Sequence, residues 1–227
     1  MKVVILQSNY VPWKGYFDLI QEADIFVFYD CVKYTKNDWR NRNIIYTKNG
    51  KQWLTIPIES AATNQLIQEV EIKDTSWQKQ HFKTLFFGYK KAPYFYQLEE
   101  LIIDYLQERE WTSLSQLNQY LIQKISEKIG IKTQFRNANE FDMTGDRVER
   151  LFSILKELKA TEYISGQAAK SYLDGQEHLF EEKNILLSFK NYPSYPIYTQ
   201  LSEPFEDGVS ILDLIANIEW KEIKNYI

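Results

Sequence analysis

The sequence predicts an α/β fold with a Rossmann-like parallel sheet core that begins with a βαβ unit. Two short apolar runs, residues 3–6 and 25–28, are typical of strands buried on both faces. Between them, residues 13–20 carry apolar side chains at helical spacing, and Pro12 suits the start of that helix. Because a βαβ unit makes its two strands parallel, the loops that follow these strands should meet at one edge of the sheet.

A β-hairpin is predicted next. Residues 43–46 and 52–58 read as strands, and Asn49 and Gly50 between them supply the positive φ angles that a tight turn needs. Residues 66–72 alternate well enough to predict a further strand.

The middle and C-terminal parts are predicted to be mainly helical. The expected elements, in order, are helices at 77–90, 93–108 and 113–129, a strand at 132–136, a helix at 145–158, a segment at 163–166 that leads into a short helix at 167–173, an extended segment at 185–189 and an apolar helix at 209–218. Gly130 stands where a helix-ending left-handed residue belongs. We expect a single α/β domain spanning 1–227, with 75–130 as a candidate helical subdomain.

The composition narrows the possible functions. A net charge of −4 with interspersed signs disfavours general nucleic-acid binding and leaves room for a local basic pocket. The chain has one cysteine and two histidines without metal-ligand spacing, so we expect no disulfide and no metal site. The amino terminus lacks signal-peptide features and no apolar run reaches membrane-spanning length, which predicts a cytoplasmic location without membrane insertion. The oligomeric state is not predicted.

Polar and aromatic residues in the first loop suggest a small-molecule site. They directly follow the first strand, where backbone amides at the new helix can receive an anion. The candidate ligand-binding residues are Gln7, Asn9, Tyr10, Trp13, Gly15 and Tyr16. The alternative is an ordinary polar connection, with Trp13 and Phe17 packed in the core.

The second loop, residues 30–43, is rich in cations and amides, as a phosphorylated, hydroxyl-rich ligand requires. Arg40 and Arg42 are the strongest phosphate-binding candidates, because arginine can hold two phosphate oxygens in a fork. Lys36 is a further candidate, although its charge equally suits a solvated loop. Asp30 could be a general base, a ribose contact or a loop cap.

His81 is the best acid/base candidate, since the ordinary pKa of histidine lies near neutrality. It falls on a helical segment beside Trp77 and Leu85, so a buried structural histidine is the alternative. Cys31 lacks a nearby histidine in the sequence, and inert packing is the expected role.

Several ordered motifs resemble the WbqC-like protein family. They are QSNYVPWKGYF at 7–17, ADIFV at 23–27, WRNRNI at 39–44, YISGQAAKSYLD at 163–174 and VSILDL at 209–214. Ser8 departs from the proline common in the family, and we expect this to loosen the first loop. The resemblance implies bacterial surface-polysaccharide biosynthesis, often within O-antigen gene clusters, and placement of an amino acid or acyl group on an amino sugar.

A more distant resemblance concerns nucleotidylyltransferases and class I synthetases. Residues 13–16 take the place of their His-x-Gly-His motif, and residues 165–170 resemble their second phosphate-binding loop, which makes Ser165, Gly166 and Lys170 phosphate-binding candidates. Both signature histidines are absent, which removes the usual donors to a phosphoryl-transfer transition state.

The sequence therefore predicts an enzyme that transfers an acyl or aminoacyl group to the amine of a nucleotide-linked amino sugar. Asp30 or His81 would remove the amine proton. The donor would be an acyl-coenzyme A or an amino acid activated with ATP and magnesium. The alternative is a noncatalytic sugar-nucleotide-binding or assembly protein on a nucleotidylyltransferase-like fold.

Overall fold

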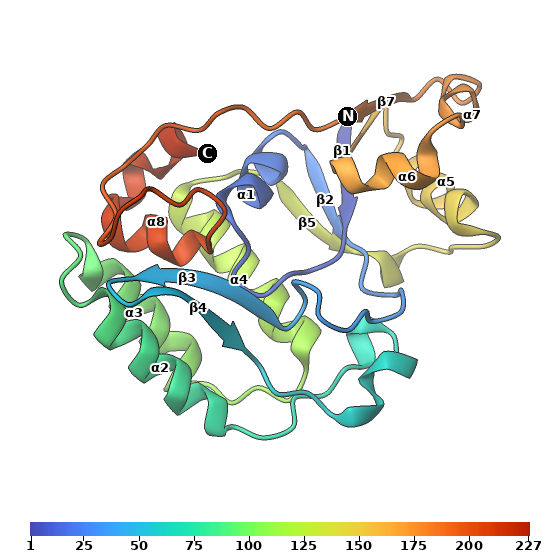
Figure 1. Cartoon of the computed structure of the whole chain (residues 1–227). Coiled ribbons are helices and arrows are strands. Elements are labelled where there is room, and N and C mark those ends of the chain that lie inside the picture. The colour runs from blue at the N-terminus through green and yellow to red at the C-terminus, as the bar shows by residue number, and fades with distance from the viewer.

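The computed structural model describes residues 1–227, apart from the side chain of Ala61. In this described part, five parallel strands form a central sheet (Figure 1). They are β1 (Lys2–Leu6), β2 (Ile25–Phe28), β5 (Gln134–Asn137), β6 (Glu162–Ser165) and β7 (Leu186–Phe189). The spatial order is β5-β2-β1-β6-β7, the order of one Rossmann half extended by two strands. The α/β class predicted from the sequence is confirmed.

The βαβ unit that opens the chain consists of β1, helix α1 (Lys14–Gln21) and β2. The two strands run parallel, with Val3 opposite Ile25 and Leu6 opposite Phe28. Strand β6 pairs with β1 on its other side. The chain order therefore reverses between β1 and β6, and ligands of open α/β sheets bind outside the carboxyl ends of the strands at such a point.

Alternating side chains of the sheet enter two separate cores. Val3 and Ile5 of β1 pack on one face beneath α5 (Arg147–Glu157), α6 (Lys170–Leu173) and α7 (Glu177–Glu181). Val4 packs on the opposite face with α1, α3 (Phe95–Leu106) and α4 (Leu114–Ile129). Each fully buried side chain of this kind contributes about 1.5 to 3 kcal/mol. This two-sided burial explains why the strands read as continuous apolar runs.

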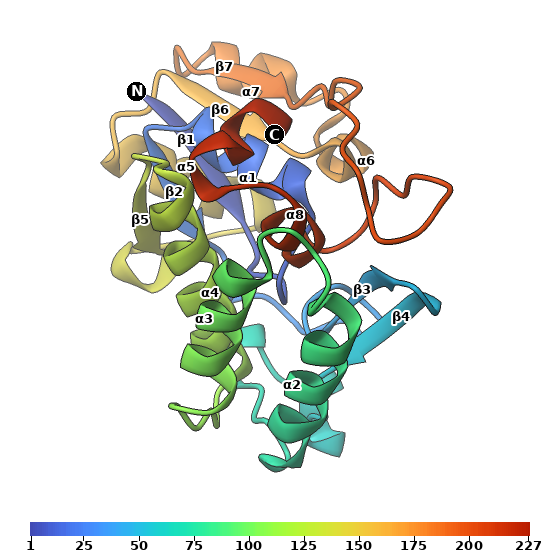
Figure 2. The ribbon, with the colours of Figure 1, turned by 90° about the vertical axis from the view of Figure 1, so that its left-hand side faces the viewer.

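The predicted hairpin is present as β3 (Arg42–Thr47) and β4 (Gly50–Thr55). Thr47 pairs with Gly50, and the positive φ of the turn belongs to Gly50, at 83°. Figures 1 and 2 both place the hairpin beside α2 (Ser76–Tyr89), outside the central sheet. Helix α8 (Ile211–Asn217) begins against β3, because the amide of Ser210 donates to the carbonyl of Ile44 (2.8 Å).

The helices predicted in the middle of the chain are confirmed as α2, α3 and α4. Gly130 ends α4 in the left-handed region with φ 84°, as its sequence position predicts. Apolar side chains of all three helices belong to the same core as α1 and β1. A separate helical subdomain at 75–130 remains a prediction.

The strand predicted at 66–72 is wrong. The chain forms a single 3₁₀ turn, η2 (Ile67–Glu69), in which the side chain of Glu69 accepts from the amide of Leu66 (2.9 Å). The flanking residues make isolated bridges, with Leu66 opposite Lys33 and Ile72 opposite Ile58. Alternating burial along this segment therefore reflects contacts with several neighbours.

The remaining short helices are η1 (Ser60–Asn64), η3 (Ala138–Glu140), η4 (Gln167–Ala169) and η5 (Trp220–Tyr226).

The loop from 190 to 209 crosses over α1. Lys190 pairs with Asp18 (2.8 Å), and the buried Lys14 pairs with Asp207 (2.5 Å). The amino group of Lys14 also lies 4.8 Å from the ring centre of Tyr195. These contacts fix the loop over the first helix. None of the described helices combines the length and apolar character that crossing a bilayer requires.

Candidate functional site

The loop after β1 is held in a strained shape. Val11 has a φ of 36°, which is an outlier for a β-branched residue. The Asn43 side-chain amide donates to the carbonyls of Tyr10 (3.0 Å) and Val11 (2.9 Å), and the Ser210 hydroxyl donates to the same Val11 carbonyl (2.7 Å). Such a conformation persists only where neighbours over-determine it. The hairpin and the start of α8 together fix this loop.

Arg40 joins the two loops that the sequence predicts to meet. Its guanidinium donates to the side-chain oxygens of Asn9 and of Gln7, the latter at 3.2 Å. The side chain is 13% exposed, and Asp38 lies 3.6 Å away. The cation is thus oriented by two amides, and its Nε is a buried donor without a hydrogen-bond partner among the described residues.

An exposed aromatic pair flanks this arginine. The rings of Trp39 and Trp53 stack with centres 5.8 Å apart and an interplanar angle of 25°, and about half of each side chain is exposed. The Arg42 guanidinium lies 4.4 Å from the Trp53 ring centre, and it donates to the Asn37 carbonyl (2.6 Å). Stacked tryptophans backed by a cation form a flat surface suited to a sugar or a base.

A pocket of about 360 Å³, within the size range of small-molecule sites, lies next to Asn9 and Trp39, and neither Arg40 nor Trp53 lines it. It is lined by Asn9, Pro12, Trp13, Trp39, Asn43 and Gly208. Trp13 covers Gly15 so closely that a β-carbon at position 15 would lie 2.3 Å from the indole ring. The absence of a side chain at Gly15 therefore allows the Trp13 ring to take its place in the pocket wall.

Asp30 lies at the carboxyl end of β2, buried and surrounded by donors. It accepts from the amide and hydroxyl of Ser8 (both 2.8 Å), from the hydroxyl of Ser115 and from the amide of Gln119 (3.0 Å). The sequence left three roles open for Asp30, namely a general base, a ribose contact and a loop cap, and this hydrogen bonding matches the loop cap. The expectation that Ser8 loosens the loop is wrong, because its two donors fasten it, and a proline there would have neither.

His81 and Tyr10 lie in the core away from the pocket. The Tyr10 hydroxyl is 3.0 Å from Nδ1 of His81 and 3.4 Å from the hydroxyl of Tyr105. Burial lowers the pKa of His81 to about 4, although a hydrogen bond with the Thr55 backbone opposes the shift. Tyr16 is also buried, and its hydroxyl donates to the Gln7 carbonyl (2.8 Å). Tyr10 and Tyr16 hold the first loop from within.

The third predicted loop follows β6 at the same sheet edge. Ser165 is buried, with its hydroxyl 3.2 Å from that of Tyr163. Gly166 has open space where a side chain would begin. Lys170 is exposed, and its amino group lies 5.4 Å from the Phe189 ring centre. Lys36 is exposed in the second loop. Neither Lys36 nor Lys170 lines the pocket next to Asn9 and Trp39.

Sequence reasoning missed the contributions of Trp53, Asn43 and Gly208. The high aromatic content was a signal for the tryptophan pair, but the pairing across the hairpin could only be seen in the structure.

A larger cavity of about 1070 Å³ lies along α5 and α7, lined by segments within 146–160 and 176–185. We place the candidate site at the smaller pocket, because residues of the loops after β1 and β2 line it together with Gly208, and because Arg40 donates to one lining residue, Asn9. The described residues contain no group of three or more histidine, cysteine or acidic side chains arranged to hold a metal ion.

Comparison with known proteins finds a relative and a family model that match most of the chain. The chain is 42% identical over 218 residues to the "Uncharacterized protein Rv1507c" of Mycobacterium tuberculosis (strain ATCC 25618 / H37Rv), covering 96% of this chain and 94% of that protein. No solved structure matches the chain. A model of the WbqC-like protein family matches residues 7–225, which include all three loops. The chain belongs to the WbqC-like protein family.

Proposed function

We propose that this protein binds a nucleotide-linked amino sugar at the carboxyl edge of its sheet and transfers an acyl or aminoacyl group to the sugar amine. The observation that carries the proposal is Arg40, which donates to Gln7 and to Asn9, a residue of the pocket lining, where the loops after β1 and β2 meet. Family membership supports a role in polysaccharide biosynthesis.

The binding part of the proposal follows from the shapes and charges of the loops. The charge of the Arg40 guanidinium suits a phosphate group, which would replace Gln7 or Asn9 at a terminal nitrogen, because the Nε is buried. The Trp39 and Trp53 pair offers a stacking surface for the sugar or base. Lys170, beyond the exposed turn at Gly166, would neutralise a second phosphate.

The proposed reaction forms one amide bond. The sugar amine attacks the carbonyl carbon of the donor with its nitrogen lone pair, and the bond from that carbon to the leaving group breaks. The amine loses one proton, and the leaving group departs with the bonding electron pair. Because an ammonium has no lone pair, the site must receive the neutral amine or accept its proton. For Asp30 to be that base, it would have to release one of its four hydrogen bonds.

The two candidate acyl donors are an acyl-coenzyme A and an amino acid activated with ATP and magnesium. Arg40 and Lys170 suit the phosphates of coenzyme A or of ATP. Magnesium prefers carboxylate ligands, but the carboxylates within the loop after β2 are Asp38, paired with Arg40, and Asp30, surrounded by donors. This donor set does not fit a protein-held magnesium ion, and we derive no step through one.

The buried positions of Asp30 and His81 favour a second candidate, a noncatalytic sugar-nucleotide-binding or assembly protein. Asp30 fastens three segments, and His81 has a pKa of about 4 within the core. A base with so low a pKa is a weak proton acceptor from an amine at neutral pH.

A transfer assay separates the two candidates. Uridine- and thymidine-diphosphate amino sugars are incubated with acyl-coenzyme A, or with amino acids plus ATP and magnesium, and mass spectrometry follows the sugar. We expect an amide product, formed about 10- to 100-fold more slowly by Arg40→Ala, since a hydrogen bond to a charged group contributes about 1.5 to 3 kcal/mol. Arg109→Ala, an exposed arginine change on another face, is the matched control. Binding without product would favour the noncatalytic candidate, and neither binding nor product would contradict both.

A further inference from the structure

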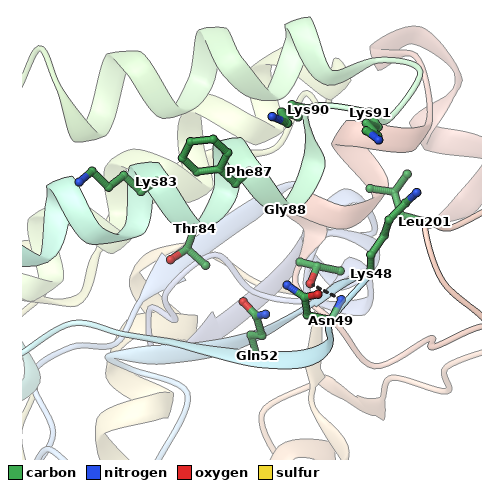
Figure 3. Close-up of a pocket in the computed structure, with 11 residues that line it drawn as sticks. Lys48, Asn49, Gln52, Lys83, Thr84, Phe87, Gly88, Lys90, Lys91 and Leu201 are labelled. Carbon is green, nitrogen blue, oxygen red and sulfur yellow. Dashed lines mark hydrogen bonds between the residues drawn. The ribbon is translucent and has the colours of Figure 1, made fainter.

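A second cavity, of about 470 Å³, lies at the turn end of the hairpin (Figure 3). Its walls are the hairpin turn and the last turns of α2, with Leu201 at one end. The five residue steps of β3 between Arg42 and Thr47 span about 17 Å, so this cavity is separate from the pocket beside Arg40.

Four lysines line this cavity, namely Lys48 from the turn and Lys83, Lys90 and Lys91 from α2 and the residues after it. Within the described part of the chain, none of the four pairs with a carboxylate. The lining contains no acidic residue among those described, although the whole chain carries a net charge of −4. The cavity is therefore a local positive region in an acidic protein, and such a region attracts anions.

Neutral polar groups and one aromatic ring complete the lining. Thr84 on α2 and Gln52 on β4 approach the cavity from opposite walls, with Asn49 beside them (Figure 3). The Thr84 hydroxyl donates to the Gln80 carbonyl (2.9 Å), which leaves its oxygen free to accept. Phe87 is 65% exposed. These groups suit hydroxyls and a ring attached to the anion.

The floor of the cavity is rigid. A β-carbon at Gly88 would lie 2.8 Å from the Thr47 methyl group, so the glycine lets α2 approach β3 closely. The Tyr46 amide donates to the Tyr89 hydroxyl (3.2 Å), which in turn donates to the buried Asp213 (3.1 Å). These contacts fix the backbone of α2 against β3, whereas the four lysine side chains are exposed and would be ordered when a ligand binds.

We propose that this cavity is a second binding site, beyond the proposed function, for the phosphate groups of a soluble phosphorylated ligand, with a diphosphate as the favoured group. Lysine ammonium groups bind phosphate as compact point charges, and these exposed side chains can turn towards a multiply charged group in the cavity, although the Lys90 amino group lies 4.9 Å from the Phe87 ring centre in this structure. The amides and Phe87 would contact the part of the ligand beyond its phosphates.

Calorimetric titration with pyrophosphate tests this proposal. We expect the wild type to bind, and the double variant Lys48→Gln and Lys91→Gln to bind at least about tenfold more weakly, a change of about 1.4 kcal/mol. The control is Lys79→Gln with Lys132→Gln, which removes the same charge from exposed lysines outside the cavity. Arg40→Ala should keep pyrophosphate binding at the lysine cavity, so failure here is distinguishable from failure of the proposed function.

Three outcomes would overturn the proposal. They are absence of pyrophosphate binding to the wild type, equal weakening by the cavity and control variants, and loss of binding in Arg40→Ala alone. A sedimentation arm uses vesicles of phosphatidylcholine and phosphatidylglycerol. Vesicle binding that depends on Lys48 and Lys91, without pyrophosphate binding, would assign the cavity to a lipid surface and also overturn the proposal.

Discussion

At the scale of single residues, Asp30 links parts of the chain that are far apart in sequence. Its carboxylate accepts from Ser8 after β1 and from Ser115 and Gln119 on α4. One side chain thereby fixes the first loop to the helix beneath it.

Removing this acceptor should destabilise the protein. We expect Asp30→Ala to lower the free energy of unfolding by about 3 to 5 kcal/mol, because it leaves buried donors unpaired. Asp30→Asn should cost less, since its oxygen still accepts from Ser8. Denaturant unfolding measures both. A fully stable Asp30→Ala protein would show that the carboxylate has no structural role.

His81 should make stability depend on pH. Its pKa falls from an ordinary value of 6.5 to about 4 on burial, so the unfolded chain binds the proton more readily between these values. The contribution is complete above about pH 6.5 and is lost as pH falls towards about 4, amounting to about 3 kcal/mol.

The measurement is denaturant unfolding across this pH range for wild type, His81→Gln and His178→Gln. We expect His81→Gln to reduce the pH dependence and the exposed His178→Gln to leave it unchanged. An unchanged pH dependence in His81→Gln would contradict the buried neutral histidine.

The sequence predicted that Arg40, Gln7 and Asn9 lie together, from their place after parallel strands, and hydrogen bonds join them in the structure; their role in ligand binding stays a prediction. It did not predict that Tyr10 and Tyr16 point into the core. A tyrosine carries both an apolar ring and a polar hydroxyl, so its type alone does not tell a pocket wall from a core residue whose hydroxyl is paired.

At the scale of elements, the contact between α2 and β3 depends on Gly88. Alanine favours a helix interior over glycine by about 1 kcal/mol, but the added carbon would collide with the Thr47 methyl group at 2.8 Å. Overpacking of this kind costs about 1 to 3 kcal/mol.

We therefore expect Gly88→Ala to destabilise the protein, and Thr47→Ser to restore the loss when combined with it, because serine removes the methyl and keeps the hydroxyl. Thermal unfolding of both single variants and the double variant gives the coupling energy. Strictly additive effects would show that the predicted collision is absent.

The elements themselves could be predicted where a single periodicity dominates, as in α4 with its terminal Gly130. The segment 66–72 shows why others could not. Its apolar residues face several different neighbours, and the resulting alternation imitates a strand.

At the scale of the whole molecule, the strand order brings the loops after β1, β2 and β6 to one edge. The sequence predicted the first two loops as neighbours through the βαβ unit. The strand order and the hairpin that completes the tryptophan pair depend on contacts between distant segments, which a local pattern does not contain.

The two sites divide the molecule along the hairpin. The pocket beside Arg40 lies at the open end of β3 and β4, and the lysine cavity lies at their turn. Strand β3 is anchored at two points, by Ser210 before α8 at Ile44 and by Tyr89 of α2 at Tyr46.

The most direct test of the account is calorimetric titration of uridine-diphosphate amino sugars into wild type, Arg40→Ala and the Arg109→Ala control. The account predicts binding that Arg40→Ala weakens about 10- to 100-fold and Arg109→Ala leaves unchanged. Equal affinity in all three proteins, or no binding to any of them, would contradict the site at the carboxyl edge of the sheet.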